Sequence, residues 1–141
     1  MSDGPDSIAA AQAHLAEEFQ LFDDWMDRYQ LVVDLGKALD SLPEAERRDE
    51  LKVPGCQSQV WLKSSFDGRL MHFRAASDAI ITSGLIALLL KVYSGRTPRE
   101  ILETPFTLAG EIGLQTHLSP SRANGFANMV KRIAEEAAKH V

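Results

Sequence analysis

The feature that most limits how this chain can fold is a change in its hydrophobic period. Over residues 57–64 polar and apolar side chains alternate, which predicts a half-buried strand. The Asp67–Gly68 pair that follows is typical of a two-residue hairpin turn, so residues 70–76 are expected to form the returning strand. The segments on both sides repeat apolar residues at helical spacing. Together these patterns predict an α+β fold, with a small antiparallel sheet packed against several α-helices.

The hairpin turn also predicts which residues of the two strands face each other. With Asp67–Gly68 as the turn, the expected pairs are Leu62 with Phe73, Val60 with Ala75, and Ser58 with Ser77. The same register continues to Gln57, which it places opposite Asp78. It then places Cys56 beside Ala79, close to the N-terminus of the following helix.

A third strand is expected just before this hairpin. Leu51 and Val53 alternate with polar residues and are followed by the turn-forming pair Pro54–Gly55. A short strand here would pair with the first strand of the hairpin. The predicted sheet is therefore a three-stranded antiparallel meander.

Five segments carry helical signals. They are residues 8–22, 25–39, 79–93 and 97–102, and a long C-terminal helix that begins after Ser119. The third of these is apolar on nearly every side, which predicts a central buried helix capped by Ser77 or Asp78. Gly84 within it would allow close approach of another backbone. Asn124–Gly125 is a poor choice near the start of a helix and indicates close packing or a functional constraint there.

Composition narrows the class of protein. The chain has 141 residues, 45% of them hydrophobic, which fits one domain spanning residues 1–141. Its formal net charge is -5, so it lacks the basic surface that binding to nucleic acid requires. Its most apolar run, residues 84–90, is too short to cross a bilayer, and no secretory signal is visible. The expectation is a soluble cytoplasmic protein that acts neither on nucleic acid nor in a membrane.

Cys56 is the single cysteine of the chain. A lone cysteine excludes an intramolecular disulfide, a Cys-x-x-Cys pair and an all-cysteine metal site within one chain. The remaining choices are a buried structural thiol and a reactive thiol, and the usual burial of free cysteine favours the structural one at this point. A helix N-terminus near Cys56 would favour the thiolate, whereas apolar shelter and the Asp78 carboxylate would disfavour it.

Four blocks of the sequence resemble one known family, the SufE proteins. The blocks are "RYQLVVDLGKAL" at 28–39, "VPGCQSQVWL" at 53–62, "SDAIITSGLIALLL" at 77–90 and "HLSPSRANGFANMVKRI" at 117–133. They occur in order and cover most of the chain. The resemblance implies an α+β fold shared broadly with IscU-type scaffolds. It also implies a sulfur-acceptor protein that partners a cysteine desulfurase in iron–sulfur cluster assembly.

The resemblance also assigns roles to residues. It implies that Cys56 accepts sulfur as a persulfide from the desulfurase and passes it on to an iron–sulfur scaffold. It implies an acceptor loop around that thiol, made of Gly55, Gln57, Ser58 and Gln59. By the same resemblance Asp78 is an acidic residue near the loop, and Arg122 a basic residue near the loop and the partner-binding face. Leu51 departs from the family pattern, which is expected to have a polar residue there.

The resemblance implies no cofactor or metal in this chain, because pyridoxal phosphate belongs to the desulfurase, a SufS-like or CsdA-like enzyme. The protein is then a carrier and activator rather than a stand-alone enzyme.

Three other functions compete with this interpretation. A Cys–His thiol hydrolase needs a histidine beside Cys56, and His117 is the reasonable candidate. An iron–sulfur scaffold normally uses several cysteine thiolates, whereas this chain has one. A pure interaction module would not need the thiol at all.

Overall fold

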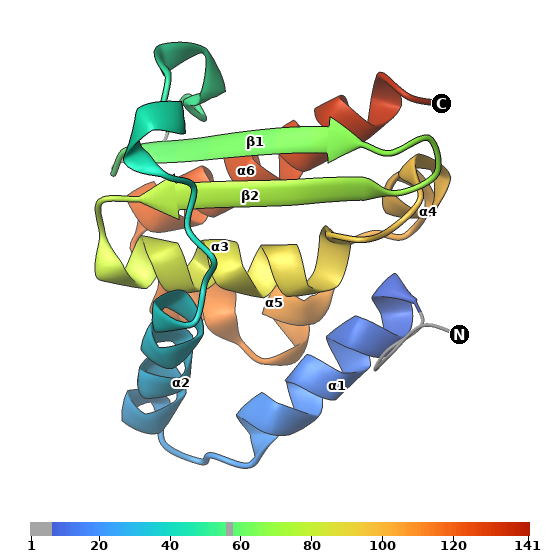
Figure 1. Ribbon diagram of the computed structural model, residues 1–141. Helices are drawn as coiled ribbons and strands as arrows, with labels where there is room; N and C mark the ends of the chain where they lie inside the picture. The colour runs from blue at the N-terminus through green and yellow to red at the C-terminus, as the bar shows by residue number, and fades with distance from the viewer. Residues whose placement is uncertain (1–6, 56–57) are drawn as a thin grey trace.

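The computed structural model describes residues 7–55 and 58–141. In chain order the elements are α1 (Ile8–Gln20), α2 (Trp25–Lys37), the short 3₁₀ turns η1 (Glu44–Glu46) and η2 (Asp49–Leu51), β1 (Val60–Phe66), β2 (Met71–Ser77), α3 (Ile80–Tyr93), α4 (Pro98–Glu103), α5 (Leu108–Glu111), η3 (Leu114–His117) and α6 (Pro120–Ala138). Helices α3 and α6 cover one face of the hairpin, and the segment after α2 crosses its other face (Figure 1). The predicted α+β class is confirmed.

The prediction of a third strand is wrong for the described residues, whose sheet has two strands. The segment before the hairpin touches β1 only briefly, through a bridge between Lys52 and Trp61 and a 2.9 Å hydrogen bond from the Val53 N–H to the Val60 carbonyl. Pro54 follows at once, and proline has no N–H to continue a ladder. The expected strand is therefore reduced to a single point of pairing.

The predicted register of the hairpin is wrong by two residues. The observed pairs include Val60 with Ser77, Leu62 with Ala75, Ser64 with Phe73 and Phe66 with Met71. The connection is longer than a two-residue turn because the Asp67 side chain accepts hydrogen bonds from the backbone N–H groups of Arg69 (2.9 Å) and Leu70 (2.7 Å). The Asp67 N–H also donates to the Leu70 carbonyl. A shift of two residues keeps the strand faces unchanged, so Val60 and Leu62 still face the core, although Trp61 on the opposite face is also buried.

The Asp67 carboxylate gives the hairpin a pH-dependent anchor. The hydrogen bond from the Leu70 N–H, with those from His72 and Arg69, lowers the pKa of the Asp67 carboxyl from its ordinary value of 3.8. Because the pKa of Asp67 is lower in the folded than in the unfolded protein, its ionised carboxylate stabilises the fold at any pH above the unfolded-state pKa. This contribution is lost as the pH falls from the unfolded-state pKa through the folded-state pKa.

The replacement Asp67→Asn tests this anchor, because asparagine keeps an acceptor oxygen but does not titrate. We expect the urea midpoint of the wild-type protein to exceed that of the variant at pH 6, and the gap to shrink as pH falls from 4 toward 2. Urea denaturation at a series of pH values measures the gap. Midpoints that fall in parallel over that range would contradict the prediction.

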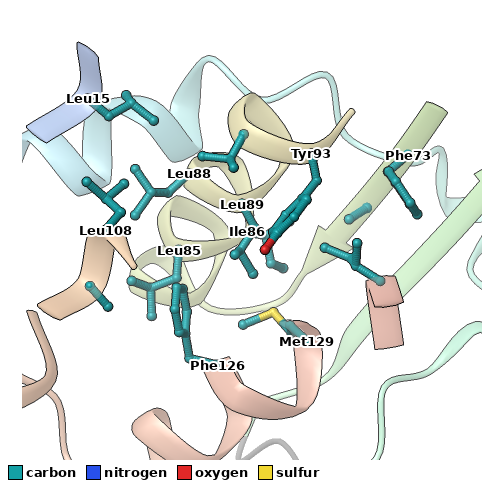
Figure 2. Close-up of a cluster of buried hydrophobic side chains, with 14 of the residues drawn as sticks. Leu15, Phe73, Leu85, Ile86, Leu88, Leu89, Tyr93, Leu108, Phe126 and Met129 are labelled. Atoms are coloured by element: carbon teal, nitrogen blue, oxygen red, sulfur yellow. The ribbon is translucent and has the colours of Figure 1, made fainter. Parts of the chain in front are cut away.

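The core lies between the inner face of the hairpin and the helices. Helix α3 runs through its centre and is buried on most sides, as predicted. Figure 2 shows Phe126 and Met129 of α6 pointing toward Leu85 and Ile86 of α3. On the outer face of the sheet Leu42 forms a second small cluster with Trp61 and Ala76, with Leu51 packed against it. The apolar Leu51 therefore has a packing role at a position where the family resemblance led us to expect a polar residue.

The outer edge of β2 is also occupied. Met71 exchanges two 2.7 Å hydrogen bonds with the turn that follows α3, donating to the Arg96 carbonyl and accepting from the Gly95 N–H. Phe73 donates its N–H to the Ser94 hydroxyl, and the Ala75 carbonyl accepts from the Leu42 N–H. Backbone groups and the Ser94 hydroxyl from two other parts of the chain thus take the place of a neighbouring strand on this side.

Capping at the helix N-termini follows the sequence with one exception. The hydroxyl of Thr97 accepts the Glu100 N–H at α4, and that of Ser119 accepts the Arg122 N–H at α6, as predicted. For α3 the prediction is wrong, because the N-cap residue is Ala79, without a side-chain cap. The carboxylate of Asp78 is engaged elsewhere, in the loop described next.

Candidate functional site

The structure describes two limbs of the loop that the family resemblance predicts to be the acceptor loop. The leading limb is residues 52–55 and the trailing limb is residues 58 and 59; Cys56 and Gln57, which join them, lie outside the described residues. The limbs begin to pair where the Val53 N–H donates to the Val60 carbonyl at 2.9 Å. The start of β1, the end of β2, and the N-terminal ends of α3 and α6 lie at this same end of the molecule (Figure 1).

Gly55 in the leading limb is in contact with α6. Its φ of +79° lies in the left-handed region that favours glycine. A Cβ added there would lie 2.2 Å from the side-chain nitrogen of Asn128. The backbone conformation therefore favours glycine, and a side chain here would displace the Asn128 amide. Asn128 is a neighbour of the loop that the sequence did not reveal.

The trailing limb is tied to the start of α3. The Gln59 N–H donates to Asp78 Oδ1 at 3.1 Å, and the Asp78 N–H donates back to the Gln59 carbonyl at 3.4 Å. The Thr82 hydroxyl lies 3.4 Å from the Ser58 hydroxyl. The structure thus places Asp78 beside the loop, but opposite Gln59 rather than opposite Gln57, because the hairpin register differs from the predicted one.

Replacement of Asp78 tests how its side chain holds the trailing limb. Asp78→Ala removes the acceptor for the Gln59 N–H and is expected to cost about 1 kcal/mol of stability and to speed amide exchange at Gln59. Asp78→Asn retains the acceptor oxygen and should stay close to wild type. Urea denaturation and residue-resolved hydrogen exchange measure both effects. Equal behaviour of the two variants would show that the hydrogen bond does not hold this limb.

A small pocket lies between the trailing limb and the two helices. It is lined by Ser58, Thr82, Leu85, Ser121, Arg122, Gly125, Phe126 and Met129. The free space is about 10 Å³, room for roughly one water molecule. Arg122 comes from the first turn of α6, so the structure brings this predicted basic residue to the loop. Gly125 is buried at the pocket wall, which agrees with the constraint predicted for Asn124–Gly125.

His117, the candidate for a Cys–His enzyme, belongs to a different cluster. Its ring stacks on Trp25 with ring centres 3.8 Å apart, and its Nδ1 lies 3.1 Å from the Gly113 carbonyl. Tyr29 donates its hydroxyl hydrogen to the His117 carbonyl. Among the described residues that line the pocket beside the loop there is no histidine. The described geometry therefore gives His117 a packing role between α2 and η3.

The other predictions about the site concern metals and membranes. Within residues 7–55 and 58–141 no three His, Cys, Asp or Glu side chains are grouped so as to hold a metal ion. Across the same part of the chain, no helix combines the length and the apolar character needed to span a bilayer.

Comparison with known proteins gives one consistent family. A family model described as "SufE: Fe-S metabolism associated domain" matches residues 13–137. An uncharacterized SufE-like protein of Rhizobium etli is 44% identical over 97% of this chain and 96% of its own length. An uncharacterized SufE-like protein of Synechocystis is 39% identical over 89% of this chain and 79% of its own length.

Two further matches add context. The SufE-like protein 1 of Arabidopsis thaliana, named chloroplastic/mitochondrial, is 42% identical over 84% of this chain, which matches 32% of that protein. The solution structure of a hypothetical protein from Thermus thermophilus superposes with a TM-score of 0.76 at 18% identity, covering 92% of this chain and 95% of that one. The last match supports the fold. The family match and the identities over most of the chain show that this protein belongs to the SufE family and that its role is in Fe–S metabolism.

Proposed function

We propose that this protein accepts sulfur from a pyridoxal-phosphate-dependent cysteine desulfurase on Cys56, stimulates that enzyme, and delivers the sulfur to a scaffold for iron–sulfur cluster assembly. The observation that carries the proposal is the position of the lone cysteine. Cys56 lies in sequence between two limbs that are held by α6 on one side and α3 on the other, in a chain of the SufE family.

The chemistry needs one thiolate and no metal. The Cys56 thiolate attacks the terminal sulfur of the partner's cysteine persulfide, a new S–S bond forms, and the bond between the partner's two sulfurs breaks. The partner's thiolate leaves, so there is no net oxidation or reduction. A second cysteine nearby would attack the new persulfide and form a disulfide, so a single cysteine suits a carrier.

The surrounding residues fit this role. The pocket offers an apolar floor from Leu85, Phe126 and Met129, with Arg122 at its rim. The guanidinium of Arg122 is a fixed positive charge close to the loop and would favour a thiolate or a persulfide anion. Asp78 is engaged by a backbone N–H and serves to hold the trailing limb.

The proposal also covers partner and location. The chain acts as a carrier and activator rather than a stand-alone enzyme, and the pyridoxal phosphate belongs to the desulfurase, either SufS-like or CsdA-like. A reducing compartment such as the cytoplasm keeps a lone thiol free for this reaction.

The direct test is the mass of the Cys56 peptide. The protein is incubated with its desulfurase and cysteine, digested without reductant, and compared with a sample lacking cysteine. We expect one or more added sulfur atoms on this peptide, removed by dithiothreitol. An unchanged mass, with no stimulation of sulfide release, would overturn the proposal.

A further inference from the structure

A row of polar side chains on α6 runs alongside the acceptor loop. Asn128, Arg132 and Glu136 are spaced four residues apart, so they project from one face of the helix. The same face contacts the leading limb and the residues just before it. None of these three positions was singled out by the sequence.

Arg132 is bound to the backbone that enters the loop. Its Nη1 donates to the Lys52 carbonyl and its Nη2 to the Glu50 carbonyl, both at 3.2 Å. Its Nε donates to Glu136 at 3.4 Å. The planar guanidinium thus reaches two backbone carbonyls and one carboxylate, an arrangement that the single ammonium group of a lysine cannot reproduce in full.

The environment of Arg132 distinguishes it from an ordinary surface cation. The Arg132 and Glu136 side chains are only 19% and 16% exposed, so solvent screens their interaction less than that of an exposed pair. Burial raises the pKa of Glu136, but hydrogen bonds from Ser64 (2.7 Å) and Lys139 (2.9 Å) outweigh it and leave the pKa lowered. Glu136 therefore stays ionised and keeps Arg132 oriented.

Asn128 acts one turn closer to the N-terminus of α6. Its amide packs on Gly55, where an added Cβ would lie 2.2 Å from it. The leading limb is thus held at Lys52 and Gly55, and the residue before it at Glu50, by α6, while the trailing limb is held by Asp78 ahead of α3. Each limb depends on a different helix.

We infer that Arg132 and Asn128 are positioning residues for Cys56. They set the placement of the leading limb, and so of the thiol that follows it in the chain, for docking to the desulfurase. The inference rests on the proposed function for its meaning in catalysis. It concerns a property of the loop, however, that can be measured without the desulfurase. The rate at which iodoacetamide alkylates Cys56 reports the access and thiolate fraction of the thiol directly.

The first experiment compares Arg132→Gln with Lys131→Gln, an exposed neighbour on the same helix that loses the same charge. For Arg132→Gln we expect alkylation to quicken about 3- to 10-fold at pH 8. With the desulfurase, the half-saturating concentration of this protein should rise by a similar factor at an unchanged maximal rate. Lys131→Gln should match wild type.

Arg132→Lys keeps the positive charge and at least one donor, so its alkylation rate and half-saturating concentration should lie between those of wild type and Arg132→Gln. This variant also serves as the test if Arg132→Gln does not fold. Equal alkylation rates and half-saturation for the Arg132 variants and Lys131→Gln would overturn the inference. If wild-type protein gains no sulfur from the desulfurase, the proposed function fails, and the alkylation comparison still decides the positioning role.

A second experiment tests Asn128 through a double-mutant cycle with Gly55. Gly55→Ala forces a Cβ against the Asn128 amide, and Asn128→Ala removes that amide. We expect Gly55→Ala to change the alkylation rate several-fold, and a smaller change in the Asn128→Ala background. Gly68→Ala shares a positive φ but has open space around the added Cβ, so it should leave the rate unchanged. Additive effects of the two changes would overturn the contact as a positioning device.

Discussion

Replacement of Gly84 by alanine is expected to destabilise the protein by about 3 kcal/mol, which would lower the melting temperature by roughly 10 °C. The added Cβ would lie 2.1 Å from the Val32 carbonyl oxygen, which is backbone and cannot rotate away. Gly36 on the facing helix is also close to the backbone of Gly84, so the two helices touch through their main chains. Helices α2 and α3 would have to move apart along their contact. The loss should exceed the gain of about 1 kcal/mol that alanine normally brings to a helix.

Gly110→Ala is the matched control for this prediction. Gly110 also lies in a helix, but an added Cβ there meets nothing within 4 Å. It should be neutral or slightly stabilising. Thermal and urea denaturation of both variants measure the difference, and a Gly84→Ala protein as stable as Gly110→Ala would refute the close crossing of α2 and α3.

Cys56→Ser is expected to abolish sulfur acceptance and to reduce desulfurase turnover to the rate of the enzyme alone. The serine hydroxyl is almost fully protonated at neutral pH, and it cannot form the S–S bond on which the transfer depends. Binding to the desulfurase should persist, because the rest of the surface is unchanged. Sulfide release at saturating carrier measures turnover, and a pull-down or calorimetric titration measures binding.

This variant separates the proposed carrier from a pure interaction module. A module would stimulate the desulfurase equally well with serine at position 56, whereas a carrier would bind without stimulating. Ala127→Ser, an exposed position on α6, serves as a control for the introduction of a hydroxyl group and should behave as wild type.

The helices could be predicted from sequence because their signals are local. The apolar spacing located α1, α2, α3 and α6, and the caps at Thr97 and Ser119 lie where the sequence places them. The strand faces were also correct, since alternation survives any shift by two residues. The register itself failed because it depends on side-chain hydrogen bonds of Asp67, which an Asp–Gly pair does not reveal.

The candidate site was predictable in part. Ser58, Asp78 and Arg122 came from the family resemblance, and the structure brings them to one end of the molecule. Asn128 and Arg132 could not be found in this way, because their partners are a glycine Cα and backbone carbonyls. Main-chain acceptors leave no residue-type signal in a sequence. Such contacts become visible only when the fold places α6 beside residues 50–55.

The covered edge of β2 has a consequence for self-association. A two-stranded sheet exposes two rows of backbone hydrogen-bonding groups, and each can recruit a strand from another molecule. Here the N–H and carbonyl of Met71, the N–H of Phe73 and the carbonyl of Ala75 are already bonded to groups of residues 42 and 94–96. Edge-to-edge pairing with a strand of another molecule along that side is blocked by the chain itself, which lowers the tendency of the protein to aggregate.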